Sequence, residues 1–246
     1  LDKEHFGALH EIGNCFNMLG NMDGAVKYFT SFCNQNPYSA DGWMELGFSL
    51  NLTQKHAEAL EAFDFSLAID EENDLVQFHR GITLMYLDRE TDAIEVFLEL
   101  VKRTPNDNGV YICLGQCYYT LSEYKKAEIN FRKALHLEPN DPEGWYGLGN
   151  VMEEEENLEE ALKCYEKAVA IEPSNDQYLH YLADVQIDLY LFTEAILNLK
   201  TALEKNSENI DCWVSLAYAY RNIGELSNSV NILKQALVHN PDNAFV

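Results

Sequence analysis

Apolar and polar positions follow one another along this chain with a helical spacing, and the pattern returns in register every 34 residues. From Phe6 onward the chain divides into seven segments without an insertion, and they start at residues 6, 40, 74, 108, 142, 176 and 210. Apolar residues within a segment stand three or four apart, which is the spacing of one helix face and not of a strand. The pattern therefore predicts an all-α chain of seven 34-residue repeats.

Two positions of the repeat keep the same residue size throughout, if the first residue of each segment is counted as repeat position 1. Position 20 holds Ala25, Ala59, Ala93, Ala127, Ala161, Ala195 and Ser229. Position 24 holds Phe29, Phe63, Phe97, Phe131, Tyr165, Leu199 and Leu233. Small residues let two helices approach closely and large ones fill the gap between them, as close packing requires. We therefore expect each repeat to be a pair of packed helices.

Polar caps and prolines predict where these helices begin and end. The first helix of a repeat opens after Asn, Asp or Ser, as in TPNDNGVY and EPSNDQYL, and such residues cap free N–H groups. The second helix ends near a proline, which cannot continue a helix, at Pro37, Pro105, Pro139, Pro173 and Pro241. A single helix pair cannot bury its apolar faces alone, so the repeats are expected to stack.

A more specific pattern lies over this frame. The motif W-x₂-L-G, or a variant with tyrosine in place of tryptophan, is followed by A-x₃-F and a closing proline, and this order recurs every 34 residues. The clearest examples of its first part are Tyr111, Leu114, Gly115 and Trp145, Leu148, Gly149. Over residues 6–243 the chain resembles the tetratricopeptide repeat family. The third repeat departs from the pattern, with Gln77 and Arg80 in place of Trp and Leu. The resemblance implies a right-handed superhelical α-solenoid of helix-turn-helix repeats, whose first helices line a concave groove that holds a peptide or partner segment.

The whole chain, residues 1–246, is predicted to be a single array of these repeats. The last repeat ends at NPDNAFV without a polar capping helix, although a terminal repeat normally needs an outer face that water accepts. Ala244 would be position 1 of an eighth repeat. We therefore expect the chain to be a fragment of a longer protein, and we expect its exposed repeat ends to be able to drive self-association.

Charge and cysteine content narrow the class of partner. The chain has 41 acidic against 17 basic residues and a net charge of −24, which repels phosphate backbones and anionic lipids, so neither nucleic acid nor a membrane is an expected partner.

The six cysteines occupy positions expected to be small core sites, and unpaired thiols favour a reducing, cytoplasmic location. A metal site can be sketched from Cys113, Cys117 and His79, but it lacks a fourth ligand. We expect no metal and no cofactor.

Catalytic motifs are absent from the sequence. It contains no H-E-x-x-H, G-x-S-x-G or P-loop motif, and GLGNVM lacks the third glycine of a dinucleotide-binding loop. Polar residues recur with the repeat and do not converge as a nucleophile, a base and an orienting group would. The chain is therefore predicted not to be an enzyme.

The resemblance also implies which side chains face the groove, at positions 2, 5, 6, 9, 12 and 13 of each first helix. The candidate groove residues are His10, Asn14, Glu45, Phe48, Phe78, His79, Ile82, Tyr86, Ile112, Gln116, Tyr119, Tyr146, Asn150, Glu153, Glu154, Tyr181, Asp184, Tyr218 and Arg221. Their middle part is apolar and their later part is acidic. The expected partner is therefore a protein or peptide with an apolar or aromatic centre and a neutral-to-basic flank.

Three functions fit this reading. The predicted function is a non-catalytic protein–protein interaction scaffold or adaptor that binds a partner segment in the groove. The first alternative is a substrate- or partner-recruiting arm of a multidomain enzyme whose catalytic domain lies outside the sequence. The second alternative is a purely structural oligomerisation module.

Two local features carry alternatives of their own. Arg80 replaces a leucine, and its guanidinium either reaches a ligand carboxylate or turns to a neighbouring acid while its stem packs. In the run Glu153 to Glu156, the first two residues are predicted to form an acidic lip on the groove and the last two to lie in a turn. Asn157 with Glu160 matches a capping box for the next helix.

Overall fold

The computed structural model describes residues 3–239, with side chains from residue 7 onward, and every regular element within that part is an α-helix. The chain divides into two compact units, residues 1–121 and residues 122–246. Unit 1 contains α1 (Lys3–Met18), α2 (Met22–Gln35), α3 (Ala40–Leu52), α4 (His56–Ile69), α5 (Asp74–Tyr86), α6 (Glu90–Arg103) and α7 (Asn108–Thr120). Unit 2 contains α8 (Tyr124–Leu137), α9 (Pro142–Glu154), α10 (Leu158–Ile171), α11 (Asp176–Asp188), α12 (Phe192–Lys205), α13 (Ile210–Asn222) and α14 (Leu226–His239).

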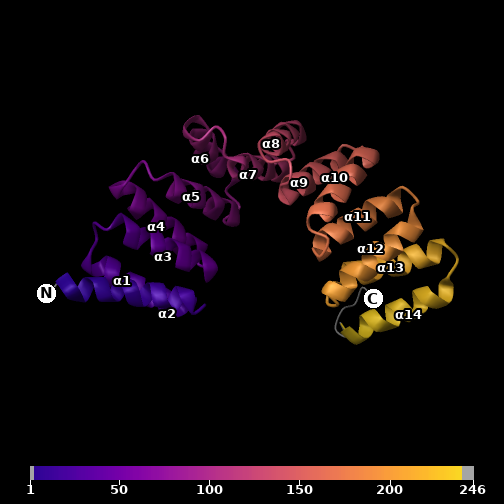
Figure 1. Ribbon diagram of the computed structural model, residues 1–246, viewed down its shortest axis with the longest axis horizontal. Coiled ribbons are helices and arrows are strands. Elements are labelled where there is room, and N and C mark those ends of the chain that lie inside the picture. The colour runs from indigo at the N-terminus through magenta and orange to yellow at the C-terminus, as the bar shows by residue number, and fades with distance from the viewer. Residues whose placement is uncertain (1–2, 240–246) are drawn as a thin grey trace. The chain divides into compact units, whose positions relative to one another are not determined.

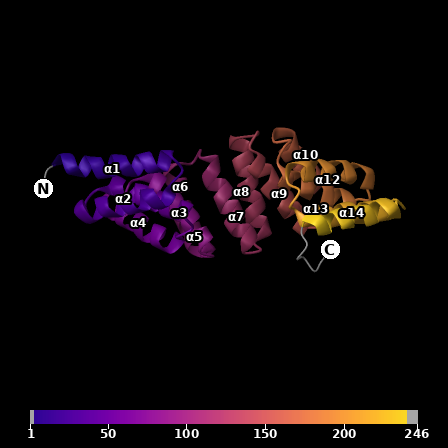
Figure 2. The ribbon, with the colours of Figure 1, turned by 90° about the horizontal axis from the view of Figure 1, so that it is seen from below.

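Within each unit the helices form a series of antiparallel pairs, in which each helix packs on the one before and the one after (Figure 1; Figure 2). The first helices of the second to seventh repeats begin at residues 40, 74, 108, 142, 176 and 210, which are the predicted starts. The first helix of the chain begins at Lys3, three residues before Phe6. The all-α repeat fold is therefore confirmed. The helix end predicted near Pro241 lies outside the described residues.

Where position 24 is aromatic, its ring is pressed onto a helix backbone at a glycine, whereas the sixth and seventh repeats have Leu199 and Leu233 at this position. A Cβ atom added to Gly47 would lie 2.5 Å from the ring of Phe63, and one added to Gly149 would lie 2.5 Å from the ring of Tyr165. The ring of Phe131 meets Gly147 of the following repeat in the same way, at 2.4 Å. Position 24 therefore packs against its own repeat and the next one, and glycine is needed because any side chain would occupy the place of the ring.

The predicted caps of the first helices are confirmed. The side-chain oxygen at the N-cap accepts a backbone N–H bond at Ser39, Asn73, Asp107, Asp141, Asn175 and Asn209. The capping box predicted at Asn157 and Glu160 is wrong, because the side chain of Asn157 makes no cap bond. The backbone N–H of Asn157 instead donates to the carbonyl of Met152 at 2.8 Å and closes the end of α9. Asn157 thus serves the helix before it.

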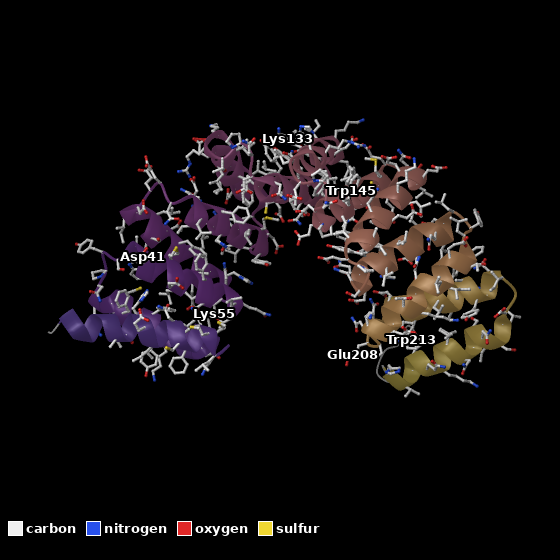
Figure 3. The ribbon with its side chains drawn as sticks, in the orientation of Figure 1. Asp41, Lys55, Lys133, Trp145, Glu208 and Trp213 are labelled. Atoms are coloured by element: carbon white, nitrogen blue, oxygen red, sulfur yellow. The ribbon has the colours of Figure 1, made fainter. Side chains whose placement is uncertain are left out.

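The aromatic residue at position 4 has a specific task, which explains the Trp of the repeat pattern. Its side chain donates to a backbone carbonyl six residues earlier, in the turn that leads from the preceding helix. Trp145 Nε1 donates to Pro139 at 2.8 Å and Trp213 Nε1 donates to Ser207 at 2.9 Å, from α9 and α13 (Figure 3). The bond satisfies a carbonyl that the helix before has left unpaired.

The turn inside every repeat uses a residue with left-handed backbone geometry at position 15. Gly20 and Gly224 supply it in the first and last repeats, but Gln54, Asp88, Ser122, Glu156 and Tyr190 supply it in the others, with φ between 54° and 62°. Non-glycine residues pay about 1–2 kcal/mol for this conformation, and a bulky residue such as tyrosine adopts it rarely.

We predict that Tyr190→Gly raises the free energy of unfolding by about 0.5–1 kcal/mol, because glycine relieves the backbone cost while its greater freedom in the unfolded chain offsets part of the gain. Tyr190 is largely exposed, and its ring meets only Phe192 edge-on among the ring contacts of the described residues. Urea denaturation followed by circular dichroism measures the change. Tyr190→Ala is the matched control, since alanine removes the ring and keeps the strain. A glycine variant no more stable than the alanine variant would contradict the prediction.

Candidate functional site

The candidate groove residues fall in both units, and each unit gathers some of them into a distinct surface. The surface of unit 1 is a cleft of about 780 Å³ on α3 and α5 and the turn between α3 and α4, which we call the unit 1 cleft. It is lined by Phe48, Asn51, Leu52, Gln54, His56, Leu75, His79, Ile82 and Tyr86. The cleft therefore brings together four predicted residues, namely Phe48, His79, Ile82 and Tyr86.

One wall of the unit 1 cleft is a set of rings in edge-to-face contact. The His79 ring lies 4.6 Å from the Phe48 ring and 5.7 Å from the Phe78 ring, at interplanar angles of 74° and 83°. Burial lowers the pKa of His79 below its ordinary value, so the imidazole stays neutral at pH 7. The wall thus presents an uncharged aromatic surface, which suits an apolar or aromatic ligand group.

A second part of the cleft lining comes from the turn, the start of α4 and the end of α5. The His56 ring stacks on the ring of Tyr86 with centroids 4.7 Å apart, and its Nδ1 lies 3.1 Å from Asn51 Oδ1. Asn51 in turn donates from Nδ2 to Thr83 Oγ1 at 2.7 Å. Leu52, Leu75 and Tyr86 remain more than half exposed, so the cleft has apolar surface that is open to a ligand.

Sequence reasoning missed the contribution of the turn. Gln54 and His56 lie just after α3, outside the helix positions that the family geometry assigns to the groove. Asn51 and Leu52 stand at positions 12 and 13 of the second repeat, which belong to that set, but they were not among the candidate residues. A signal for them was present in the sequence, because an aromatic histidine opens the second helix where other repeats have residues such as Glu90 or Leu158. The stacking partner of His56 could not be known without the fold.

Other predicted residues of unit 1 lie apart from the cleft lining. His10 and Asn14 contact each other through Nδ1 and Nδ2 at 3.3 Å. Burial raises the pKa of Glu45 above its ordinary value, and nearby His10 offsets part of this rise. Ile112 is 4% exposed and belongs to the core, so it offers almost no surface to a ligand. Gln116 and Tyr119 on α7 are half-buried.

The surface of unit 2 is a cluster of tyrosines on α9, α10 and α11, which we call the unit 2 tyrosine surface. The Tyr146 ring lies 5.2 Å from the rings of both Tyr178 and Tyr181, and the Tyr165 ring lies 6.0 Å from that of Tyr181. Burial is the main reason that the pKa of Tyr146 stands well above its ordinary value. These phenols therefore act as neutral rings with polar edges.

The hydroxyl of Tyr165 ties this surface to its acids. It lies 2.8 Å from both Asn150 Oδ1 and Glu153 Oε2, two predicted groove residues that are thereby brought together. Tyr165 occupies position 24, where most repeats have phenylalanine, and the sequence signal for its role is the added hydroxyl. Sequence reasoning treated this residue only as a core ring.

Acidic side chains border the unit 2 tyrosine surface. A hollow of about 600 Å³ is lined by Glu153, Glu154, Glu156, Leu158 and Asp188. Burial raises the pKa of Glu153, and the charges of Asp184, Asp188 and Glu154 raise it further, against the lowering effect of the Tyr165 hydroxyl. Acids that raise one another's pKa are stabilised by an added positive charge.

Three further predicted residues, Asp184 on α11 and Tyr218 and Arg221 on α13, belong to two separate small networks. Asp184 Oδ2 lies 3.1 Å from His180 Nε2, and Asp184 Oδ1 accepts a bond of 2.8 Å from Ser215. Burial nonetheless raises the pKa of Asp184. On α13 the Arg221 guanidinium lies over the Tyr218 ring at 5.0 Å, and both side chains are exposed.

The structure favours the packing interpretation of Arg80. Its Nε lies 2.6 Å from Asp64 Oδ1 on α4, and its side chain is 28% exposed. This pair lines a second hollow with Leu67, Ile69 and Gln77, separate from the residues of the unit 1 cleft. The Arg80 head therefore turns to a neighbouring acid while its stem covers the helix.

Two surveys of the described residues complete the site. Among residues 3–239 no group of three or more His, Cys, Asp or Glu side chains is placed to hold a metal ion. Within the same part of the chain no helix has the length and apolar character needed to cross a membrane.

Five cysteines are buried as expected, and burial raises the pKa of the Cys33, Cys117, Cys164 and Cys212 thiols to about 12. Cys15 departs from the prediction, because it is exposed on α1.

Comparison with known proteins supports the repeat fold. Tetratricopeptide repeat models match residues 8–39, 109–141, 142–175 and 210–243, which is more than half of the chain. The peroxisomal targeting signal receptors of Kluyveromyces lactis and Saccharomyces cerevisiae are 26% and 28% identical over 82% and 76% of this chain. The chain covers only 42% and 38% of those two receptors. A tetratricopeptide repeat protein from Parabacteroides merdae has the same fold, with a TM-score of 0.76, 17% identity and coverage of 98% of this chain and 96% of that one.

The chain consists of stacked helix pairs whose first helices expose side chains along one surface. This arrangement is typical of the α-helical repeat proteins that act as protein–protein interaction scaffolds. Within this class, the matched repeats show that the chain belongs to the tetratricopeptide repeat family.

We predict that Arg80→Leu leaves the free energy of unfolding unchanged or raises it by up to about 1 kcal/mol. A solvent-exposed ion pair contributes only about 0–1 kcal/mol, and leucine restores the residue that the second, fourth, fifth, sixth and seventh repeats bury at this position. Urea denaturation measures the change, and Asp64→Leu is the control that removes the same ion pair without restoring the repeat pattern. A clear loss of stability in Arg80→Leu alone would contradict the prediction.

We predict that Glu153→Gln stabilises the protein at pH 7 and that the gain disappears as the pH falls. The folded-state pKa of Glu153 is raised above its ordinary value of 4.5, so the folded chain holds this proton more tightly than the unfolded chain. Protonated Glu153 makes its full contribution to the stability of the fold below pH 4.5. This contribution is lost as the pH rises through the folded-state pKa. Denaturation at pH values from about 4, just below the ordinary carboxyl pKa, to about 8 measures the difference in unfolding free energy between the variant and the unmodified chain.

Glu155→Gln is the matched control for this experiment, because it removes the same charge from an exposed neighbour in the turn. Its effect should be small and should not depend on pH in the same way. An equal, pH-dependent gain in both variants would show that the total charge is responsible and not the setting of Glu153.

Proposed function

We propose that this chain is a non-catalytic scaffold that binds a partner protein or peptide through the first-helix surfaces of its two units. The unit 1 cleft accepts an apolar or aromatic side chain of the partner, and the unit 2 tyrosine surface with its acids accepts a neutral-to-basic stretch. The observation that carries the proposal is the unit 1 cleft itself, because it combines a volume of about 780 Å³ with uncharged aromatic walls and exposed leucines.

The chemistry of the cleft supports this choice of ligand. Leu52 and Leu75 expose 67% and 52% of their surface at its rim, and covering them removes apolar area from water. The neutral His79 offers an uncharged ring, and the stacked rings of His56 and Tyr86 offer aromatic faces and edges. Buried aromatic anchors surrounded by a polar rim are the usual source of affinity in such peptide sites.

The acids of unit 2 support a basic flank on the partner. Glu153 and Asp184 both have raised pKa values, with burial as the first cause and neighbouring acids as a further one. A lysine or arginine placed beside them would relieve this repulsion, and the tyrosine rings would favour its approach through cation–π contacts. The similar receptors of the two yeasts are named for a targeting signal, so recognition of a short signal segment fits the same repeat fold.

A peptide library displayed on phage and selected on the purified chain tests the proposal. We expect the selected peptides to carry an apolar or aromatic residue, lysine or arginine, or both. Leu75→Asp should weaken the selected peptides about tenfold or more, because it places a charge in the apolar rim. Leu197→Asp on α12, where the leucine is 67% exposed, is the matched control and should leave the affinity unchanged.

Charge reversal tests the second half of the proposal. The combined variant Glu153→Lys, Glu154→Lys and Asp184→Lys should lose the peptides with a basic flank and keep those without one. Selected peptides that bind equally well to this variant would refute the acidic contribution. A library that yields no binder whose affinity depends on Leu75 would refute the cleft as the binding site.

A further inference from the structure

A series of hydrogen bonds runs from the core of the third repeat to the lining of the unit 1 cleft. The hydroxyl of Thr83, which is fully buried on α5, donates to the carbonyl oxygen of His79 at 2.7 Å. The same hydroxyl oxygen lies 2.7 Å from Asn51 Nδ2 at the end of α3. Asn51 Oδ1 in turn lies 3.1 Å from His56 Nδ1 at the start of α4. We call Thr83, Asn51 and His56 the cleft network.

The direction of every bond in the cleft network is fixed by the carbonyl group at its inner end. A carbonyl oxygen can only accept, so the single hydroxyl proton of Thr83 goes to His79 and the hydroxyl oxygen must accept from Asn51. The amide of Asn51 therefore turns its NH₂ group toward Thr83 and its oxygen toward His56. An amide oxygen also only accepts, so Nδ1 of His56 must carry a proton.

The free nitrogen of His56 is consequently a hydrogen-bond acceptor. A neutral imidazole has one protonated nitrogen, so a proton on Nδ1 leaves a lone pair on Nε2. Among the described residues, the ring of His56 makes the bond through Nδ1 and the stacking contact with Tyr86. Its Nε2 is not one of the buried unpartnered atoms in that part of the chain, so it reaches solvent. Because His56 lines the unit 1 cleft, the cleft surface includes this acceptor.

Tryptophan is the side chain that matches both the acceptor and the apolar wall. Its indole is a large apolar ring system that suits the uncharged rings of Phe48 and His79, and its N–H group only donates. A tyrosine hydroxyl also accepts and so needs a donor of its own, and a phenylalanine ring has no donor for His56. The cleft volume of about 780 Å³ lies within the range of small-ligand pockets, about 300–1,000 Å³.

We propose that the unit 1 cleft selects a tryptophan of the partner, whose indole N–H donates to Nε2 of His56 while the ring lies against the apolar wall. His56 sets this specificity, and Asn51 and Thr83 are positioning residues that hold its acceptor nitrogen in the required state. The inference rests on the proposed function of the cleft, because it names the side chain that the cleft takes. It adds a directional bond to the apolar contacts of the site.

Nitrogen NMR of the chain with ¹⁵N-labelled histidine tests the tautomer at about pH 8.5, where ordinary imidazoles are neutral. We expect His56 to be protonated on Nδ1. The exposed His136 on α8 is the internal reference, for which we expect the Nε2-protonated form that free histidine favours in water. Thr83→Val removes the hydroxyl at nearly the same volume and should move His56 toward the pattern of His136. A His56 ring protonated on Nε2 in the unmodified chain overturns the proposal.

Titration with N-acetyltryptophan amide, and with its analogue methylated on the indole nitrogen, tests the recognition step. The methyl resonances of Leu75 and Ile82 report binding in the cleft. We expect the unmethylated probe to bind about two- to tenfold more tightly, which is the usual contribution of one hydrogen bond, and to shift Nε2 of His56.

Two matched variants show whether His56 is the acceptor. His56→Phe keeps a ring beside Tyr86 and removes the nitrogen, so the two probes should bind it equally. His136→Phe makes the same substitution at an exposed site of α8 and should keep the preference for the unmethylated probe. Circular dichroism confirms that the variants fold. A preference that persists in His56→Phe overturns the role of His56.

The titration also separates this inference from the proposed function. Equal affinities of the two probes for the unmodified chain, with shifts at Leu75 and Ile82, overturn the selection of tryptophan and leave the cleft as an apolar binding site. An absence of shifts at these two residues with either probe overturns both the inference and the cleft as the binding site.

Discussion

The contact on which this fold depends is an aromatic ring laid on a helix backbone. At Gly47 and Gly149 the neighbouring ring occupies the space that a side chain would take, and at Gly147 the ring comes from the preceding repeat. Rings at position 24 thus join the two helices of one repeat at Gly47 and Gly149, and they join one repeat to the next at Gly147. Because this contact sets the helix spacing, the outward residues of the first helices are free to vary, and function can differ along the chain without a change of fold.

The two units use this freedom for different chemistry. Unit 1 surrounds a cleft with uncharged rings and leucines, and burial keeps His79 neutral there. Unit 2 has tyrosines and acids on its first helices, and the hydroxyl of the fully buried Tyr165 contacts two of these side chains, Asn150 and Glu153. A single added oxygen atom therefore converts a packing residue into one that organises Asn150 and Glu153. The same frame position serves packing in one repeat and polar organisation in another.

Most of the fold could be predicted from the sequence, because the repeat period fixes helix starts that recur at the same position. Errors arose where one residue can serve two neighbours: Asn157 could cap the following helix or close the preceding one, and the sequence pattern does not distinguish these roles. The cleft lining was predicted only in part, since His56 enters it through a stacking contact with Tyr86 that depends on how successive repeats pack. The sequence left two interpretations of the Arg80 side chain for the same reason. Its ion pair with Asp64 on the neighbouring helix favours the packing interpretation.

The left-handed residue at position 15 has a consequence for how such chains diversify. Five different non-glycine residues adopt this conformation here, so the reversal of the chain is imposed by the helices on either side and not by the chemistry of the turn. Gln54 is one of them, and it also lines the unit 1 cleft. The fold constrains the backbone conformation of such a residue but not its identity. A mutation there can therefore change the lining of the cleft without changing the fold. Turns of this kind can therefore vary in sequence beside the cleft while the fold stays the same.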